Sequence, residues 1–159
     1  MTGTAFTGGC QCGAVRFRAE RLGRASVCHC RMCQKAFGAF YAPLVSAFGL
    51  TWTRGEPAHF ASSNLVRRGF CAACGTPLTY ERDDVTEIAI GALDDPTRAA
   101  PVIEVNPADK LPFVDGIPLL PMQPPEEAPA AADFKARVVN HQHPDHDTQA
   151  WPPAAGFGS

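Results

Sequence analysis

The sequence predicts a mainly β fold, because short β-like runs and a set of paired cysteines dominate the chain. Most runs are four to six residues long, and Gly, Pro, Asp and Ser separate them at short intervals. A helical period is visible only briefly, at residues 32–37. With 159 residues, 45% of them hydrophobic, the chain is long enough for one domain with its own core.

The β-like runs follow one another through the first 121 residues. Val15 and Phe17 illustrate the pattern, because alternate residues of a strand point to the same face. We expect strands at residues 14–19, 40–45, 50–53, 59–62, 66–70, 78–81, 87–90 and 102–105. No repeat longer than the recurring cysteine pairs is present, so the runs indicate one β-rich unit.

The composition changes near Pro121. Residues 122–159 hold five acidic against two basic residues, many prolines and few branched apolar residues, which is a poor basis for a packed core. We therefore expect a zinc-binding domain over residues 1–121 and a proline-rich, acidic tail over residues 122–159 that wraps the surface or is disordered. Within this tail, residues 130–139 are expected to form a helix of two or three turns.

Charge and hydropathy argue against two classes of partner. The net charge is −2 and the densest basic cluster is Arg67 with Arg68, a pattern that argues against nucleic acid. No stretch approaches the roughly 20 apolar residues of a membrane span. The start, MTGTAFTGG, lacks the basic and apolar segments of a secretory signal, so we expect a cytoplasmic protein.

The seven cysteines are the main chemical signal, and none stands alone. They form three groups: Cys10 with Cys12, Cys28 with Cys30 and Cys33, and Cys71 with Cys74. An odd number of thiols in a reducing compartment argues against a disulfide framework and for metal binding. Four thiolates close a structural zinc site and three leave a position open, so the sequence predicts two zinc ions.

Each cysteine spacing suits a single metal. Residues i and i+2 of an extended segment point to the same side, which would present Cys10 with Cys12, and Cys28 with Cys30, as pairs. A turn does the same for the C-x-x-C spacing of Cys71 and Cys74, and Gly75 suits the positive φ of such a turn. Gly13 after Cys12 is expected to act similarly.

The spacing alone leaves the grouping open. In one arrangement Cys10, Cys12, Cys71 and Cys74 hold one ion and Cys28, Cys30 and Cys33 hold the other. In the alternative, Cys10 and Cys12 join two cysteines of the middle group. We favour the first, because the middle cysteines lie too close in sequence to be divided between two ions without strain.

The middle group also has two interpretations. It is either an open site or a second structural site that His29 or a distant residue completes. His29 is a poor fourth ligand, because it points away from Cys28 and Cys30 if these share one face of a strand. We expect it to be a satisfied histidine that either packs in the core or supports a metal ligand, and His59 to be an ordinary strand residue.

Three motifs together resemble the glutathione-dependent formaldehyde-activating enzymes, a domain family that includes centromere protein V. They are G-G-C-x-C-G at residues 8–13, C-H-C-x-x-C-x-K at residues 28–35 and F-C-x-x-C-G-T at residues 70–76. The run IAIGAL at residues 88–93, followed by Asp94, Asp95 and Pro96, also fits the family's later strand and turn. The resemblance spans roughly residues 6–121.

The resemblance implies an Mss4-like β-tent of short antiparallel strands organised around zinc, with an irregular C-terminal tail. It matches Cys10, Cys12, Cys71 and Cys74 to a structural zinc site, and Cys28, Cys30 and Cys33 to a substrate-side site. The implied activity is a carbon–sulfur lyase one, in which glutathione and formaldehyde give S-hydroxymethylglutathione.

Chemistry supports thiol binding and leaves other functions open. Zinc would deprotonate the glutathione thiol, and the thiolate is the nucleophile that adds to a small aldehyde. A zinc that already holds three thiolates is a weak Lewis acid, so a non-catalytic thiol carrier is an alternative, and a zinc-stabilised interaction module is another. Arg31 and Lys35 are expected to contact glutathione carboxylates, with a solvated surface role as the alternative.

The tail holds a second group of metal-ligating residues, in the sequence HQHPDHD at residues 141–147. Imidazole and carboxylate groups ligate several divalent ions. Pro144 and the absence of a packed scaffold nearby favour a polar, solvated loop instead.

Overall fold

The computed structural model describes residues 5–154 and residue 156, and it is mainly β as predicted. Positions 1–4 of the N-terminal segment MTGTAFTGG lie outside the described residues. Positions 155 and 157–159 of the predicted tail also lie outside them. The strands are β1 (Phe6–Gly9), β2 (Arg16–Ala19), β3 (Arg21–Cys28), β4 (Ala42–Phe48), β5 (Thr51–Arg54), β6 (Ala58–Ala61), β7 (Arg67–Phe70), β8 (Pro77–Arg82), β9 (Val85–Ala89) and β10 (Ile103–Val105). The α-helices are α1 (Arg31–Phe37) and α2 (Ala128–Arg137), and short 3-10 turns include η1 (Ile90–Ala92), η3 (Pro107–Asp109) and η4 (Val114–Leu119).

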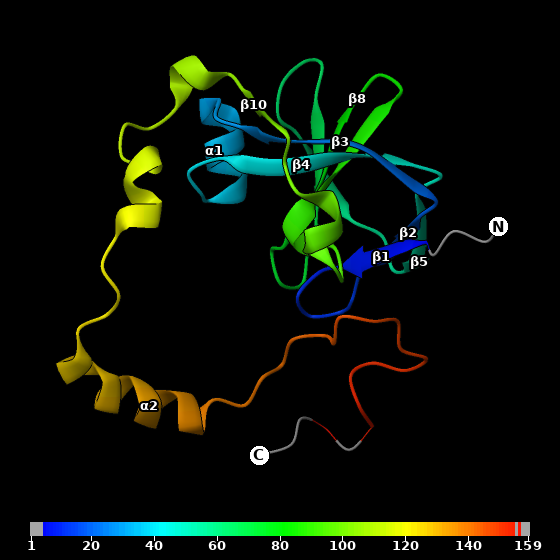
Figure 1. Ribbon diagram of the computed structural model, residues 1–159. Helices are drawn as coiled ribbons and strands as arrows, with labels where there is room; N and C mark the ends of the chain where they lie inside the picture. The colour runs from blue at the N-terminus through cyan, green and yellow to red at the C-terminus, as the bar shows by residue number, and fades with distance from the viewer. Residues whose placement is uncertain (1–4, 155, 157–159) are drawn as a thin grey trace.

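The strands form two sheets (Figure 1). The smaller sheet has the order β1-β2-β5 and the larger one the order β10-β3-β4-β9-β8-β7-β6. The prediction of antiparallel pairing holds for every pair but one, because β10 runs parallel to β3. A parallel pair needs a long connection between its strands, and here the chain from β4 to β9 supplies it.

All eight predicted strands are confirmed, with ends shifted by a few residues. Two further strands, β1 and β3, were not predicted. The sequence of β3, RLGRASVC, carries two arginines, a glycine and small residues in place of the branched and aromatic residues that strands favour. Its pairing with β10 on one side and β4 on the other, as the second strand of the large sheet, overrides that weak local preference.

Part of the main hydrophobic core lies on one face of the large sheet. Val45 pairs with Ile88 and Ile88 with Thr79, and directly paired residues point to the same face. All three side chains are buried, and Phe17 of the small sheet joins the same hydrophobic cluster. The opposite face of these strands is therefore free to carry polar groups.

Helix α1 confirms the helical period predicted at residues 32–37. Cys30 is its N-cap, and the Cys30 sulfur accepts a hydrogen bond from the Cys33 backbone N–H. The helix ends at Gly38, whose left-handed backbone (φ 58°) returns its N–H to the last carbonyls. The buried Gln34 side chain donates to the carbonyls of His29 and Asp109, which fixes the helix against the chain after β10.

The predicted tail divides into two parts with different surroundings. Helix α2 confirms the helix predicted at residues 130–139, and it stands away from the two sheets with no buried residue (Figure 1). Residues 143–151, here called the C-terminal clasp, return to the body of the protein. Its His143 is only 3% exposed, so the expectation of a polar, solvated loop is wrong for this residue. The division of the chain at residue 121 stays a prediction.

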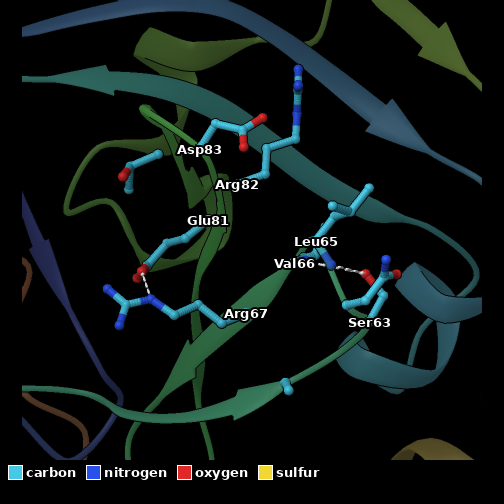
Figure 2. A pocket seen from close by; sticks show the side chains of 10 residues that line it. Ser63, Leu65, Val66, Arg67, Glu81, Arg82 and Asp83 are labelled. Carbon is cyan, nitrogen blue, oxygen red and sulfur yellow. Dashed lines mark hydrogen bonds and ion pairs between the residues drawn. The ribbon is translucent and has the colours of Figure 1, made fainter.

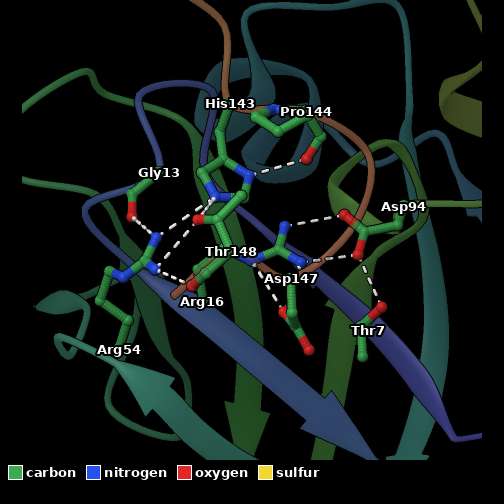
Figure 3. Close-up of polar contacts among 9 residues, drawn as sticks. All are labelled: Thr7, Gly13, Arg16, Arg54, Asp94, His143, Pro144, Asp147 and Thr148. Carbon is green, nitrogen blue, oxygen red and sulfur yellow. Dashed lines mark hydrogen bonds and ion pairs between the residues drawn. The ribbon is translucent and has the colours of Figure 1, made fainter. Parts of the chain in front are cut away.

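Polar contacts hold the clasp in place (Figure 3). Arg16 on β2 binds Asp94 with both terminal nitrogens, at 2.7 and 2.6 Å, and reaches Asp147 of the clasp at 2.7 Å. Arg54 on β5 donates to the Thr148 carbonyl at 2.5 Å. The His143 Nδ1 lies 2.7 Å from the Pro144 carbonyl, which can only accept, so Nδ1 carries the proton and Nε2 accepts.

The clasp also fits against the first cysteine turn. The Trp151 indole donates to the Cys12 carbonyl at 2.8 Å, and the His143 backbone N–H donates to the Gln11 carbonyl at 2.8 Å. An added Cβ at Gly13 would overlap the side chains of His143 and Trp151. The absence of a side chain at Gly13 is therefore what permits this close approach.

Among the described helices, none combines the length and the apolar character that crossing a bilayer requires.

Arg16→Met tests the ion-pair centre between the sheets and the clasp. The substitution leaves the Asp94 carboxylate, whose side chain is 11% exposed, without its cation, so the free energy of unfolding should fall by about 3 kcal/mol. Asp147→Asn is the matched control, because the Asp147 side chain is 52% exposed and its pair should contribute less than about 1 kcal/mol. Urea denaturation of the zinc-loaded protein measures both, and equal losses would contradict this account.

Candidate metal centres

Four cysteines from two distant turns meet at one point. Cys10 and Cys12 lie in the turn after β1, which the Gly13 N–H closes on the Cys10 carbonyl at 3.0 Å. Cys71 and Cys74 lie in the turn after β7, which the Gly75 N–H closes on the Cys71 carbonyl at 2.8 Å. Both glycines have positive φ, 74° and 78°, as expected from the sequence. The extended geometry expected for Cys10 and Cys12 is wrong, because the chain turns there.

The four sulfur atoms fit a tetrahedral metal ion. All lie within 4.8 Å of one another. The sulfurs of Cys10 and Cys12 are 3.6 Å apart, and those of Cys12 and Cys71 are 3.8 Å apart. Tetrahedral zinc with Zn–S bonds of about 2.3 Å requires sulfur separations of about 3.8 Å. The donor set and its spacing are therefore compatible with zinc.

The surroundings of the four thiols shift their pKa values in different directions. Burial raises the pKa of the Cys10 thiol to about 12. Burial also opposes ionisation of Cys74, but hydrogen bonds from the hydroxyl and N–H of Thr76 and from the Cys12 N–H lower its pKa to about 6. Cys10 and Cys71 belong to the main hydrophobic core, so ionised thiols at this position depend on a metal for compensation.

The second cluster gathers Cys28, Cys30 and Cys33, whose sulfurs also lie within 4.8 Å of one another. Cys28 ends β3, Cys30 caps α1 and Cys33 lies in the first turn of that helix. Cys30 is therefore outside the strand in which it was expected, and the turn into the helix brings the three sulfurs together instead. Cys28 and Cys33 belong to a separate small hydrophobic cluster with Ala42 and Leu44.

Two side chains from other elements donate to this cluster. The Arg68 Nη2 lies 3.2 Å from the Cys33 sulfur, and the Asn106 amide lies 3.3 Å from the Cys28 sulfur. Burial raises the pKa of Cys33 to about 12, against the opposing effect of Arg68. Burial also acts on Cys28, but hydrogen bonds from the Cys30 backbone and from Asn106 lower its pKa. These donors stabilise negative charge on the sulfurs.

A cavity of about 390 Å³ opens on the three cysteines. Apolar side chains (Met32, Leu44, Val66, Val105) line part of its wall, and polar ones (Arg24, Ser26, Ser62, Arg68, Tyr80, Arg82, Glu87, Asn106) line the rest. Burial raises the pKa of Tyr80, so its hydroxyl is protonated at neutral pH. The three-cysteine cluster is thus beside a space of ligand size.

Arg31 and Lys35 do not line this cavity. They lie on the exposed side of α1, where they border a neighbouring hollow of about 370 Å³ together with Met32 and Phe60. Arg31 also donates to the Gln34 side chain at 3.0 Å. Their contact with glutathione carboxylates stays a prediction.

The two histidines of the β domain differ in their surroundings, and neither belongs to a cysteine group. His29 is fully buried and packs edge-on against Tyr41, and it is not part of the three-cysteine group. Neither of its ring nitrogens has a hydrogen bond among the described residues, so the expectation of a satisfied histidine is wrong. The Glu104 carboxylate is 3.5 Å from Nε2. His59 lies on β6, as expected of a strand residue, and contacts Glu81 at 3.0 Å.

Neither the tail segment nor the other large hollow adds a metal site. Among the described residues, three or more metal-ligating side chains come close together only in the two cysteine groups. Residues 141–147 form no such group. A hollow of about 410 Å³ lies beside β7 and β8 (Figure 2). Arg67 and Glu81 form an ion pair there at 2.6 Å, and no thiol lines it.

Sequence reasoning missed several residues that shape the second cluster, above all Arg68. In the sequence, Arg67 and Arg68 indicate only a short basic cluster. Alternation along β7 could have separated them, because Arg67 is exposed while Arg68 is 3% exposed. Asn106 carried no local signal, since it reaches Cys28 only through the parallel pairing of β10 with β3.

Comparison with known proteins finds one family. The family model described as glutathione-dependent formaldehyde-activating enzyme matches residues 5–108, which is more than half of the chain and includes all seven cysteines. No curated protein matches the chain. The C-terminal clasp and helix α2 lie outside the matched region.

Cysteine variants should separate the two clusters. Cys74→Ser should release one zinc ion and unfold the domain, because a structural zinc–thiolate site contributes on the order of 10 kcal/mol to folding. Cys30→Ser should release one zinc ion and leave the far-ultraviolet circular dichroism unchanged. Metal content by mass spectrometry, with the spectrum of each variant, tests this, and equal loss of fold in both variants would count against the division.

Arg68→Met should weaken zinc binding at the three-cysteine cluster by roughly 10- to 100-fold, because side chains that bond to metal ligands typically have effects of this size. The four-cysteine cluster should keep its affinity. Arg67→Met is the control, since the Arg67 side chain is 64% exposed and bonds to Glu81 instead of a cysteine. Chelator competition measures both affinities, and an unchanged affinity in Arg68→Met would refute the role of this contact.

Proposed function

Since the chain belongs to the glutathione-dependent formaldehyde-activating enzyme family, we propose that it is a zinc-dependent carbon–sulfur lyase of the S-(hydroxymethyl)glutathione synthase type. It binds a thiol such as glutathione at Cys28, Cys30 and Cys33 and adds it to formaldehyde or a similar small aldehyde. The observation that carries the proposal is the three-sulfur cluster on a cavity of about 390 Å³.

The ligand count supports different roles for the two clusters. Cys10, Cys12, Cys71 and Cys74 supply the four thiolates that complete a structural zinc site. Cys28, Cys30 and Cys33 supply three, which leaves one position for a substrate thiol. A zinc ion bound there lowers the pKa of that thiol and keeps it as a thiolate.

The protein's own residues then serve the addition of sulfur to the aldehyde. The carbon–sulfur bond forms as the carbonyl π bond breaks, and the resulting alkoxide takes up a proton from water, which balances the proton that the thiol released to water on ionisation. Tyr80 lines the cavity with a protonated hydroxyl and is the proposed hydrogen-bond donor to that alkoxide. Leu44 and Val105 supply part of the apolar wall of the cavity beside the cysteines.

Arg68 offsets the charge that accumulates at such a site. Three cysteine thiolates and a substrate thiolate carry four negative charges against the two positive charges of one zinc ion. The buried Arg68 guanidinium, 3.2 Å from the Cys33 sulfur, adds a positive charge at this point. This contact offsets part of the negative charge on the Cys33 sulfur, so the site would tolerate a fourth thiolate beside the three cysteines.

A second candidate is a thiol carrier that binds glutathione without turnover. The donor set of three thiolates favours it, because a zinc ion with this set binds a fourth thiolate stably and reduces its nucleophilicity. Arg31 and Lys35, on the hollow beyond Met32, are proposed contacts for a glutathione carboxylate in either case. We also propose a cytoplasmic location, where seven free thiols stay reduced.

Exchange spectroscopy by NMR distinguishes these functions. Zinc-loaded protein should accelerate the interconversion of free glutathione and S-hydroxymethylglutathione in the presence of formaldehyde, and Cys30→Ser should abolish the acceleration. Glutathione binding with an unchanged exchange rate would identify a carrier. A protein that binds no thiol would exclude both and leave a zinc-stabilised interaction module.

A further inference from the structure

The end of the cavity away from the cysteines carries three charged side chains, Arg24, Arg82 and Glu87. Sheet register places Glu87 relative to the thiol site. Glu87 pairs with Tyr80, and Tyr80 pairs with Arg68, which bonds to Cys33. Paired residues share a face, and adjacent strands lie about 4.8 Å apart, so Glu87 stands roughly 10 Å from Arg68 on the same face.

None of the three charged groups has a direct partner. Among the described residues, no side-chain hydrogen bond or ion pair within 4 Å involves any of them. Burial raises the pKa of the half-buried Glu87, and the charges of Arg82 and then Arg24 act against this rise. Arg24 and Arg82 are both exposed at the cavity rim. The far end of the cavity therefore presents two cations around one anion, each free to bind a ligand group of opposite charge.

This charge pattern matches an α-amino acid head group. Such a group carries a carboxylate and an ammonium on one carbon atom, and arginines bind carboxylates with paired hydrogen bonds. In a γ-glutamylcysteine unit, seven bonds separate the thiol sulfur from the α-carbon of the glutamyl residue. With bonds of about 1.5 Å, the extended unit spans roughly 9 Å, which is comparable with the separation of the Glu87 backbone from that of Arg68, the residue that bonds to Cys33.

Resting on the proposed function, we propose that Arg24 and Arg82 bind the α-carboxylate, and Glu87 the α-ammonium, of the γ-glutamyl residue of the thiol substrate. These residues give the site specificity for γ-glutamyl thiols. Arg68 is held at the thiol end of the cavity, because its Nε donates to Ser62 and its Nη2 to Cys33, and only its buried Nη1 has no hydrogen-bond partner among the described residues. The site accordingly recognises the γ-glutamyl end, and γ-glutamylcysteine binds with an affinity close to that of glutathione, whereas cysteinylglycine binds weakly.

The test pairs one protein variant with one ligand change. Calorimetry on the zinc-loaded full chain compares glutathione with glutaryl-cysteinylglycine, which lacks only the α-amino group. Glu87→Gln should weaken glutathione binding by roughly 10-fold or more, the loss expected for one charge-assisted hydrogen bond in a partly buried site. The same variant should bind glutaryl-cysteinylglycine as the unaltered protein does, because this ligand offers no ammonium to Glu87.

A control and three outcomes complete the test. Asp84→Asn removes the same charge from the exposed turn between β8 and β9, outside the cavity, and should leave both affinities unchanged. If Glu87→Gln binds glutathione normally, or if cysteinylglycine binds as tightly as glutathione, this proposal is wrong while the proposed function stands. If the unaltered protein binds no thiol, both are wrong.

Discussion

The structure depends on the meeting of two cysteine turns at one metal-binding point. Cys12 and Cys71 are 59 positions apart in sequence, yet their sulfurs lie 3.8 Å apart. The first turn follows β1 of the small sheet and the second follows β7 of the large sheet, so a metal ion held there ties the two sheets together. Bringing together two turns that are 59 positions apart costs conformational entropy. The free energy of metal binding would offset this cost in addition to the burial of the hydrophobic core.

The C-terminal clasp uses the same point of the fold. It packs on Gly13, receives the Trp151 hydrogen bond at the Cys12 carbonyl and reaches Arg16 through Asp147. A segment with few apolar residues thus gains a defined position, because it docks on a turn that the cysteines have already fixed. Residues 111–139, by contrast, have almost no buried side chain and find no comparable support in the body of the protein.

The two faces of the large sheet carry different kinds of side chain: one packs in the core and the other lines the cavity. Val45, Ile88 and Thr79 are buried on the core face, whereas Glu87, Tyr80 and Arg68 stand on the face that forms the cavity. Because side chains alternate along each strand, neighbouring residues such as Glu87 and Ile88 serve opposite purposes. The cavity face can therefore carry several charged side chains without placing them in the hydrophobic core.

The sequence by itself determined the mainly β class, eight of the strands, both helices and the three cysteine groups, and it favoured, without fixing, the division of the cysteines into four and three. Each rests on a local signal, such as alternation, turn glycines or short spacing, that survives without knowledge of the fold. Only the tertiary structure decided which charged residues meet the thiols. Arg68 on β7 reaches Cys33 from 35 positions away, and Asn106, directly after β10, reaches Cys28 from 78 positions away. Glu87 lines the same cavity only through strand register. Such contacts depend on which strands pair, and β1, β3 and the parallel β10 could be placed only by the packing of the whole sheet.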